Sequence, residues 1–153
     1  MRSFMKKLYY DVKKCLGCKS CELACSLAHS LTQDIFKAIK EEKKSLPRKK
    51  VHSSKGNNYP VSCRHCKEPK CVDACMAAAL YRDDQKDMVV YDQERCVGCW
   101  MCVMSCPYGA IRPNILTKLA IRCDKCQDKD EPACVKACPT GAIIWCEEAE
   151  VKV

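Results

Sequence analysis

The sequence predicts a small, loop-rich α+β fold made of short β-hairpins and short helices. Three observations support this prediction. The chain has only 153 residues, and 17 of them are cysteines. All but one of these cysteines fall into four closely spaced groups, which alternate with strand-like and helix-like segments. One such unit is too small to bury a hydrophobic core by itself, so we expect the cysteine groups to hold the fold together.

The third cysteine group is the most informative stretch of the chain. It reads Cys96-Val-Gly-Cys99-Trp-Met-Cys102-Val-Met-Ser-Cys106-Pro107, which is the spacing C-x2-C-x2-C-x3-C-P. This spacing is typical of sites for [4Fe-4S] cubane clusters. Three thiolates wrap one cubane, while the fourth is carried away and ligates a second cluster. The run therefore predicts a partner run, and the chain contains three more.

The first run follows a predicted short strand at residues 7–12. It repeats the x2, x2, x3 spacing but is followed by Ser26 instead of proline. Residues 21–31 favour a short helix because Leu, Ala and Glu are frequent there. Gly17 and Gly98 hold the same place in their runs, where a missing Cβ is expected to let backbone N–H groups approach a cluster.

Residues 34–58 differ in character, because they hold eight Lys or Arg, three acidic residues and no cysteine. Ile35, Phe36 and Ile39 have helical spacing, so a short amphipathic helix followed by a basic loop is expected. The charge fits a solvated insertion or a docking surface for an acidic redox partner. Nucleic acid is the weakest alternative, since no aromatic residues are interleaved with the charges.

The second and fourth runs have longer middle gaps. The second lacks the proline and glycine that follow the fourth, and residues 80–82 and 88–91 then predict a β-hairpin with its turn at 83–87. Residues 107–111 are expected to turn into a short strand, and 119–122 to form a strand leading into the fourth run. Together the runs supply Cys15, Cys18, Cys21 and Cys25; Cys63, Cys66, Cys71 and Cys75; Cys96, Cys99, Cys102 and Cys106; and Cys123, Cys126, Cys134 and Cys138.

Composition excludes several classes of protein. Disulfide scaffolds suit secreted chains, and the first residues lack the apolar region of a secretion signal, so we expect a cytoplasmic protein. Residues 96–111 form the longest uncharged stretch, but their cysteine, glycine and proline content does not suit a membrane span. The formal net charge is +8. It does not indicate nucleic acid, because four bound clusters would add about −8.

With all four runs in view, the chain resembles the four-cubane polyferredoxin subunits of the dimethyl-sulfoxide reductase, formate dehydrogenase and formate-hydrogenlyase type. Within that group it is most similar to the iron–sulphur protein associated with nickel carbon-monoxide dehydrogenase. The narrower resemblance is carried by Cys21-Glu-Leu-Ala-Cys25, Ala28-His-Ser30, Cys63-Arg-His-Cys66 and Cys102-Val-Met-Ser-Cys-Pro-Tyr-Gly-Ala-Ile111. It implies two interleaved bacterial-ferredoxin-like modules around four [4Fe-4S] clusters: an outer one of residues 1–33 and 113–153, a basic insertion of residues 34–59, and an inner one of residues 60–112.

The resemblance also implies that the runs pair in a nested way, the first with the fourth and the second with the third. Spacing alone fits a sequential pairing about as well. Some relatives replace the second cysteine of the third run by tryptophan and carry a three-iron cluster, but this chain keeps Cys99. The implied ligand sets are Cys15, Cys18, Cys21 and Cys138; Cys123, Cys126, Cys134 and Cys25; Cys63, Cys66, Cys71 and Cys106; and Cys96, Cys99, Cys102 and Cys75.

The predicted function is the relay of single electrons by an electron-transfer subunit, not an enzyme. No P-loop, dinucleotide fingerprint or convincing nucleophile–base pair is visible. The resemblance implies carbon-monoxide dehydrogenase as one partner and a hydrogenase or flavin oxidoreductase as the other, in anaerobic metabolism. The alternative is a subunit of a formate dehydrogenase or molybdopterin oxidoreductase. A zinc-binding structural module is a distant alternative, because zinc sites usually use two C-x2-C pairs.

A few residues outside the ligand sets also carry expectations. Cys146 is expected to be a small apolar residue at the end of a strand, with a reactive thiol as the alternative. His65 is expected to donate a hydrogen bond to a cluster sulphur or to lie on the surface. Trp100, Tyr108 and Trp145 are expected to pack around the clusters and exclude water.

Overall fold

The computed structural model describes residues 6–147, and the chain divides into two compact units. The first unit contains residues 1–61 and 125–153, and the second contains residues 62–124. The basic segment 34–59 therefore belongs to the first unit. The expected division into an outer module, an insertion and an inner module stays a prediction, and its terminal residues lie partly outside the described range. The same holds for the start of the chain, where a secretion signal would stand.

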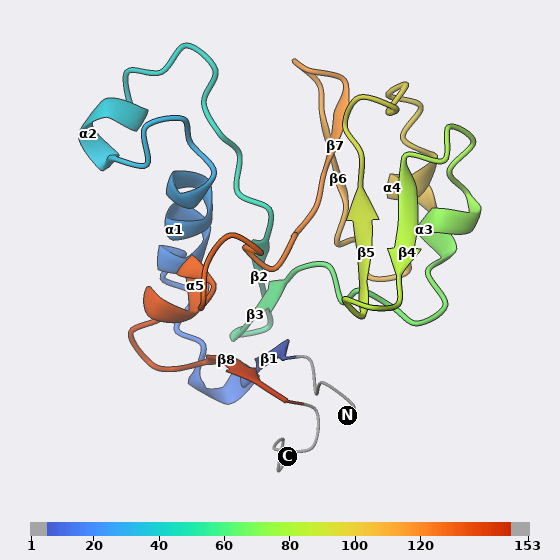
Figure 1. The fold of residues 1–153 in the computed structure, drawn as a ribbon. Coiled ribbons are helices and arrows are strands. Elements are labelled where there is room, and N and C mark those ends of the chain that lie inside the picture. Colours follow the sequence, from blue (N-terminus) through green and yellow to red (C-terminus); the bar gives the residue numbers. More distant parts are fainter. Residues whose placement is uncertain (1–5, 148–153) are drawn as a thin grey trace. The chain divides into compact units, whose positions relative to one another are not determined.

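The first unit is built from the two ends of the described chain together with the basic segment (Figure 1). The predicted strand and helix of the first run are both present, and the strand pairs antiparallel with the last strand, so that Lys7 lies opposite Cys146. The elements are β1 (Lys7–Tyr10), the 3-10 helix η1 (Val12–Lys14), α1 (Ser20–Ala28), α2 (Ile35–Ala38), β2 (Lys50–Ser54), β3 (Asn57–Val61), α5 (Ala133–Lys136) and β8 (Ile143–Cys146).

The basic segment contains more regular structure than its sequence predicts. Helix α2 is present, and the Asp34 side chain begins it by accepting hydrogen bonds from the N–H groups of Phe36 and Lys37. The expected basic loop is wrong beyond residue 49, because β2 and β3 form an antiparallel hairpin. Its two-residue connection, Lys55 and Gly56, has positive φ at both positions, which matches the twist of a hairpin.

The second unit consists of two hairpins and two short helices (Figure 1). The hairpin predicted from residues 80–91 is confirmed, with Leu80 opposite Tyr91 and Asp83 opposite Met88. A second hairpin forms where two short strands were expected after the third run and before the fourth. The elements are α3 (Lys70–Asp73), β4 (Leu80–Asp83), β5 (Met88–Tyr91), α4 (Met101–Ser105), β6 (Arg112–Asn114) and β7 (Leu119–Ile121).

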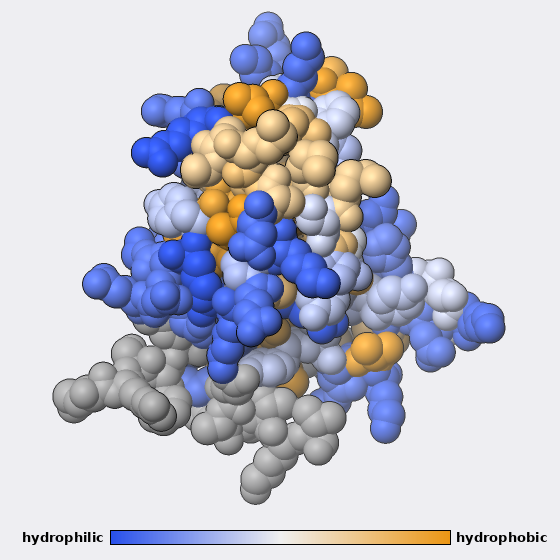
Figure 2. All heavy atoms as spheres, turned by 90° about the vertical axis from the view of Figure 1, so that its right-hand side faces the viewer, coloured by the Kyte–Doolittle hydropathy of each residue, from blue (hydrophilic) through white to orange (hydrophobic). Residues whose placement is uncertain are grey.

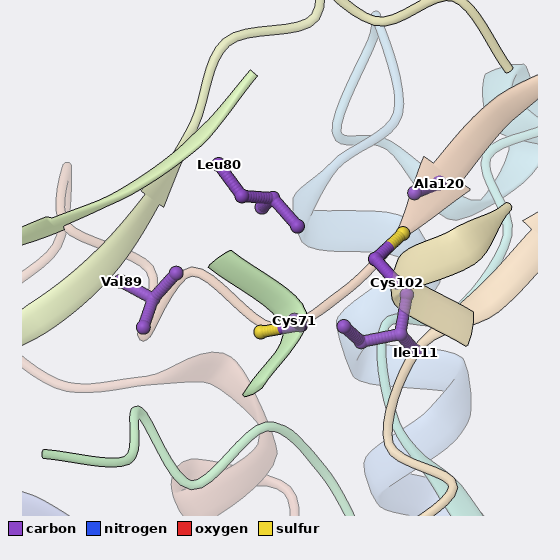
Figure 3. Close-up of a cluster of buried hydrophobic side chains, with 6 residues drawn as sticks. All are labelled: Cys71, Leu80, Val89, Cys102, Ile111 and Ala120. Atoms are coloured by element: carbon purple, nitrogen blue, oxygen red, sulfur yellow. The ribbon is translucent and has the colours of Figure 1, made fainter. Parts of the chain in front are cut away.

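Each unit has a small core in which cysteine side chains lie among aliphatic ones. Figure 3 shows the core of the second unit, where Cys71 and Cys102 lie among Leu80, Val89 and Ile111. The first unit has an equivalent core with Cys21, Cys134, Val51 and Ile143. So few apolar side chains give limited hydrophobic stabilisation, so groups held by the cysteines must supply part of it.

The surface mixes charged and apolar residues. Figure 2 shows hydrophobic residues gathered on part of a face that is otherwise largely hydrophilic. In the second unit, Met76, Val97 and Met104 are 83%, 71% and 82% exposed. Within residues 6–147 no helix is long and apolar enough to cross a membrane, since even α1 has only nine residues.

Candidate iron–sulphur sites

The third cysteine of every run occupies the same place in a short helix. It is the second residue of the helix in each case, and it is buried, because its side chain points away from solvent at the start of the helix. Helix α1 contacts α5, and α3 contacts α4, so the helices are grouped within each unit. The four cysteines are Cys21, Cys71, Cys102 and Cys134, with exposed fractions of 7%, 9%, 9% and 5%.

The residue before the second cysteine of every run has a left-handed backbone. Gly17 and Gly98 both have φ of +71°, while His65 and Lys125 reach +50° and +61°. Left-handed backbone favours glycine, which explains two of these positions. A Cβ on Gly98 would also overlap the backbone oxygen of Lys118, and one on Gly17 would lie 2.7 Å from the side chain of Asn58. The glycines thus admit other parts of the chain, a reason that the sequence alone does not reveal.

Three cavities in the structure are each lined by four cysteines. In every case three cysteines come from one run and the fourth is the last cysteine of another run in the same unit. The first run thus meets the fourth, and the second meets the third. The lining cysteines are Cys15, Cys18, Cys21 and Cys138 in the first unit, and in the second unit Cys63, Cys66, Cys71 and Cys106 in one cavity and Cys75, Cys96, Cys99 and Cys102 in the other.

The remaining four cysteines are placed differently. Cys25, Cys126 and Cys134 belong to the first unit and are buried, whereas Cys123 stands one residue before the end of the second unit. Burial raises the pKa of Cys134, and negative charge on Cys25 raises it further, so these two sulphurs interact. None of the 17 cysteines, all of which lie within residues 6–147, forms a disulfide.

The turn after the last cysteine of a run is repeated three times. In each, the N–H three residues further on donates to the carbonyl of the cysteine, with residues Ala78, Gly109 and Gly141 as donors. All three donors have positive φ, so the turn after Cys75 keeps its shape although alanine replaces glycine. The N–H of Ala110 lies 3.4 Å from the Cys106 sulphur, and that of Ala142 lies 3.2 Å from the Cys138 sulphur. Such N–H···S bonds stabilise a thiolate and tune a bound cluster.

Cys25 has no such turn, because helix α1 continues past it. Its sulphur instead accepts a hydrogen bond at 3.2 Å from the N–H of Arg48, in the basic segment. His29 Nδ1 lies 3.9 Å from the same sulphur and 2.7 Å from the Cys25 carbonyl oxygen. Although burial raises it, these partners leave the pKa of Cys25 below its usual value. The sequence carries no signal for His29 or Arg48, since both act across a loop.

The pKa values of the other thiols depend on depth. Burial raises the pKa of Cys21 and of Cys71 to about 11. A hydrogen bond from Ser20 lowers the pKa of Cys18, which is exposed. Cluster ligands must be thiolates. Deep thiols that resist ionisation therefore need a strongly bound positive centre, and iron provides it.

A buried guanidinium provides further support for negative charge in the second unit. Arg122 is only 4% exposed, and its Nη2 donates to the Cys63 sulphur at 3.5 Å and to the Val89 carbonyl at 2.8 Å. The same nitrogen lies 3.2 Å from Nδ1 of His65, which also accepts the Val89 N–H at 3.2 Å. His65 is 2% exposed, so its placement on the surface is wrong. Its position inside the cysteine loop explains this burial.

The aromatic residues expected near the clusters lie in two kinds of place. Trp100 lines the cavity of Cys96, and Tyr108 lines that of Cys63, where the Arg64 guanidinium stacks 4.0 Å from the Tyr108 ring centre. Trp145 lies in β8. Cys146 is the last residue of β8, as the sequence predicts.

Four thiols around each of three cavities, backbone N–H groups aimed at sulphur and a buried cation beside them fit [4Fe-4S] clusters. The fold and the sites thus define an iron–sulphur protein of the bacterial-ferredoxin type. The sequence model of the 4Fe-4S dicluster domain matches residues 54–148, and that of a 4Fe-4S binding domain matches residues 13–28. The chain therefore belongs to the 4Fe-4S dicluster family, and [4Fe-4S] clusters are its cofactors.

Named relatives agree with this assignment. The chain is 39% identical to an iron-sulfur protein of Rhodospirillum rubrum over 89% of its own length and 79% of the relative. It is 39% identical to electron transport protein HydN of Escherichia coli K12, covering 88% and 83% of the two proteins. With the B subunit of anaerobic dimethyl sulfoxide reductase from the same strain, the values are 33%, 88% and 70%. The protein is thus an iron–sulphur electron-transfer protein and not a catalytic enzyme, which confirms the expected class and the resemblance to polyferredoxin subunits.

Solved structures support the fold. A component of the active site complex BamBC of benzoyl coenzyme A reductase, as isolated, matches with a TM-score of 0.54 and 24% identity. The match covers 94% of this chain and 78% of that one. At this level of identity the likeness concerns the fold alone.

Proposed function

We propose that the chain relays single electrons through four [4Fe-4S] clusters between two redox proteins. The observation that carries this proposal is the set of three cavities, each lined by four cysteines from two runs. The proposed ligands are Cys15, Cys18, Cys21 and Cys138 for the first cluster; Cys25, Cys123, Cys126 and Cys134 for the second; Cys63, Cys66, Cys71 and Cys106 for the third; and Cys75, Cys96, Cys99 and Cys102 for the fourth.

The clusters supply one-electron chemistry when bound, and the protein sets the conditions for it. Backbone N–H groups at Arg48, Ala110 and Ala142 stabilise thiolate sulphur. Helices α1, α3, α4 and α5 hold the buried ligands, and the short hairpins cover them. No residue of the chain has to move a proton or bind a substrate for this function.

Two cysteines give the proposed relay its contact with partners. Cys18 and Cys99 are the exposed cysteines of the chain. Each follows an apolar residue that also faces solvent, since Leu16 is 69% exposed and Val97 is 71% exposed. Electron transfer between proteins requires a close approach to a cluster, and exposed apolar residues mark such contact sites. We therefore propose one partner at each of these loops.

The proposed partners are carbon-monoxide dehydrogenase on one side and a hydrogenase or flavin oxidoreductase on the other. The local sequence resemblance described above supports this choice. The alternative partner is a formate dehydrogenase or molybdopterin oxidoreductase, and it is favoured by relatives named as subunits of dimethyl sulfoxide reductase and thiosulfate reductase. An anaerobic, cytoplasmic setting is part of the same proposal. The family assignment argues against the zinc-binding alternative.

The proposal is tested by anaerobic reduction of the purified, oxidised protein. We expect about sixteen irons per chain, four for each cubane. Catalytic amounts of carbon-monoxide dehydrogenase and carbon monoxide should bleach the visible sulphur-to-iron absorption within the mixing time of a conventional assay. Bleaching by formate dehydrogenase and formate instead would move the assignment to the alternative partner. Zinc in place of iron would contradict the cluster proposal.

A pair of cysteine variants makes the test specific. Cys99→Ser removes a proposed ligand, so we expect the loss of about four irons per chain and of most electron flux. Cys146→Ser is the matched control, because Cys146 lies outside the four runs, and it should keep both. Equal iron loss in the two variants would contradict the ligand assignment.

A further inference from the structure

Lys49 is the most deeply buried lysine of the first unit's basic segment. It is 2% exposed, whereas its neighbour Lys50 faces solvent. Within residues 6–147, no atom has hydrogen-bond geometry to its Nζ, and no carboxylate lies within ion-pair distance of it. A buried ammonium without a partner charge is strongly disfavoured. The position of Lys49 therefore points to an anion in its surroundings.

The surroundings of Lys49 identify where that anion lies. Its Nζ stands 4.9 Å from the centre of the Tyr10 ring. Burial lowers the pKa of Lys49, but interactions with Tyr10, Cys134 and Cys21 outweigh burial and raise the pKa above its usual value. In return, Lys49 favours the thiolate form of Cys21 and of Cys134. The groups around the ammonium are thus two cysteine sulphurs and an aromatic face.

The two sulphurs belong to different proposed clusters. Cys21 is assigned to the first cluster and Cys134 to the second, and both lie in the core of the first unit. A [4Fe-4S] cluster with four thiolates carries a charge of about −2, and reduction makes it more negative. A fixed positive charge beside both clusters stabilises the reduced form of each, because it is held where water is excluded and screening is weak.

We propose that Lys49 is the buried counter-ion shared by the first and second clusters and that it raises the reduction potentials of both. It is a positioning residue that acts through the ligands Cys21 and Cys134, and this inference rests on the proposed function. One charge that serves two clusters shifts their potentials together. Electrons can then pass between them without a steep step.

The test is an EPR-monitored redox titration of the whole protein. Lys49→Met removes the charge, and Lys49→Arg keeps it. Lys50→Gln is the matched control, because it removes one exposed charge from the next residue. In Lys49→Met we expect two of the four midpoint potentials to fall, each by about tenfold in the oxidation equilibrium, which is about 59 mV for one electron. Lys49→Arg and Lys50→Gln should keep all four potentials.

Each result has a defined meaning. About sixteen irons in Lys49→Met with unchanged potentials would overturn the inference and leave the proposed function intact. If Lys49→Met fails to retain the first-unit clusters, retention by Lys49→Arg supports a requirement for charge, and loss from both variants overturns it in favour of packing. A wild-type protein without about sixteen irons would overturn the proposed function itself.

Discussion

Ala78 shows how one residue can retain a shape that its neighbours in the repeat reach more easily. It has φ of +48° and donates to the Cys75 carbonyl, while glycine takes this place after the third and fourth runs. A side chain costs roughly 1–2 kcal/mol in the left-handed region. The turn after Cys75 therefore stores strain that glycine would relieve.

We predict that Ala78→Gly stabilises the protein by about 1 kcal/mol, because relief of strain exceeds the added freedom of the unfolded chain. The measurement is the guanidinium concentration at which the visible cluster absorption is lost. Ala77→Gly is the control and should lower that concentration, since Ala77 does not have a positive φ. A lower midpoint for Ala78→Gly would refute the strain argument.

At the scale of elements, a single carboxylate joins helix α1 to hairpin β2–β3. The N–H of Val51, in β2, donates to Glu22 Oε1 at 2.6 Å. Glu22 follows the buried ligand Cys21 in α1, and Val51 is 5% exposed in the same core. This bond holds the basic segment against the helix that positions a ligand.

We expect Glu22→Ala to cost about 1–3 kcal/mol, because the buried Val51 N–H loses its acceptor. Hydrogen exchange of the Val51 amide should quicken, and the cluster absorption should be lost at lower guanidinium concentration. Glu22→Gln keeps an acceptor oxygen and should lose much less. Equal effects of the two substitutions would show that charge, not the hydrogen bond, joins the elements.

For the whole molecule, the cores predict that folding depends on the clusters. Both hydrophobic cores include cysteine side chains and few large aliphatic ones. Binding free energy of a structural metal centre is folding free energy in such small domains. Within residues 6–147 no disulfide replaces that contribution.

Removal of iron by an anaerobic chelator should therefore unfold both units. Far-ultraviolet circular dichroism should lose the signals of hairpins and helices as the visible absorption disappears, and reconstitution with iron and sulphide should restore both. An apo protein that keeps its native circular dichroism would show that apolar burial suffices.

Local features could largely be predicted from the sequence. The hairpin at residues 80–91 was predictable because its strands and turn are contiguous, and the helix at Cys21 because its residues favour helix. The β2–β3 hairpin was missed because its many charges resemble a loop, although Lys55-Gly56 carries a turn signal. The burial of His65 and Lys49 was not predictable, since it depends on Arg122 in one case and on helices α1 and α5 in the other.

The cysteine spacing alone determined the class of cofactor and the class of function, because a cubane accepts only a few spacings of thiolates along a short loop. The tertiary structure decided which runs meet, since nested and sequential pairings fit the spacing about equally. It brings the first run to the fourth through the pairing of β1 with β8, and the second to the third through α3 and α4. It also buried Lys49 against Cys21 and Cys134. Such contacts join residues far apart in the sequence, so they depend on how the whole polypeptide folds back and not on local spacing.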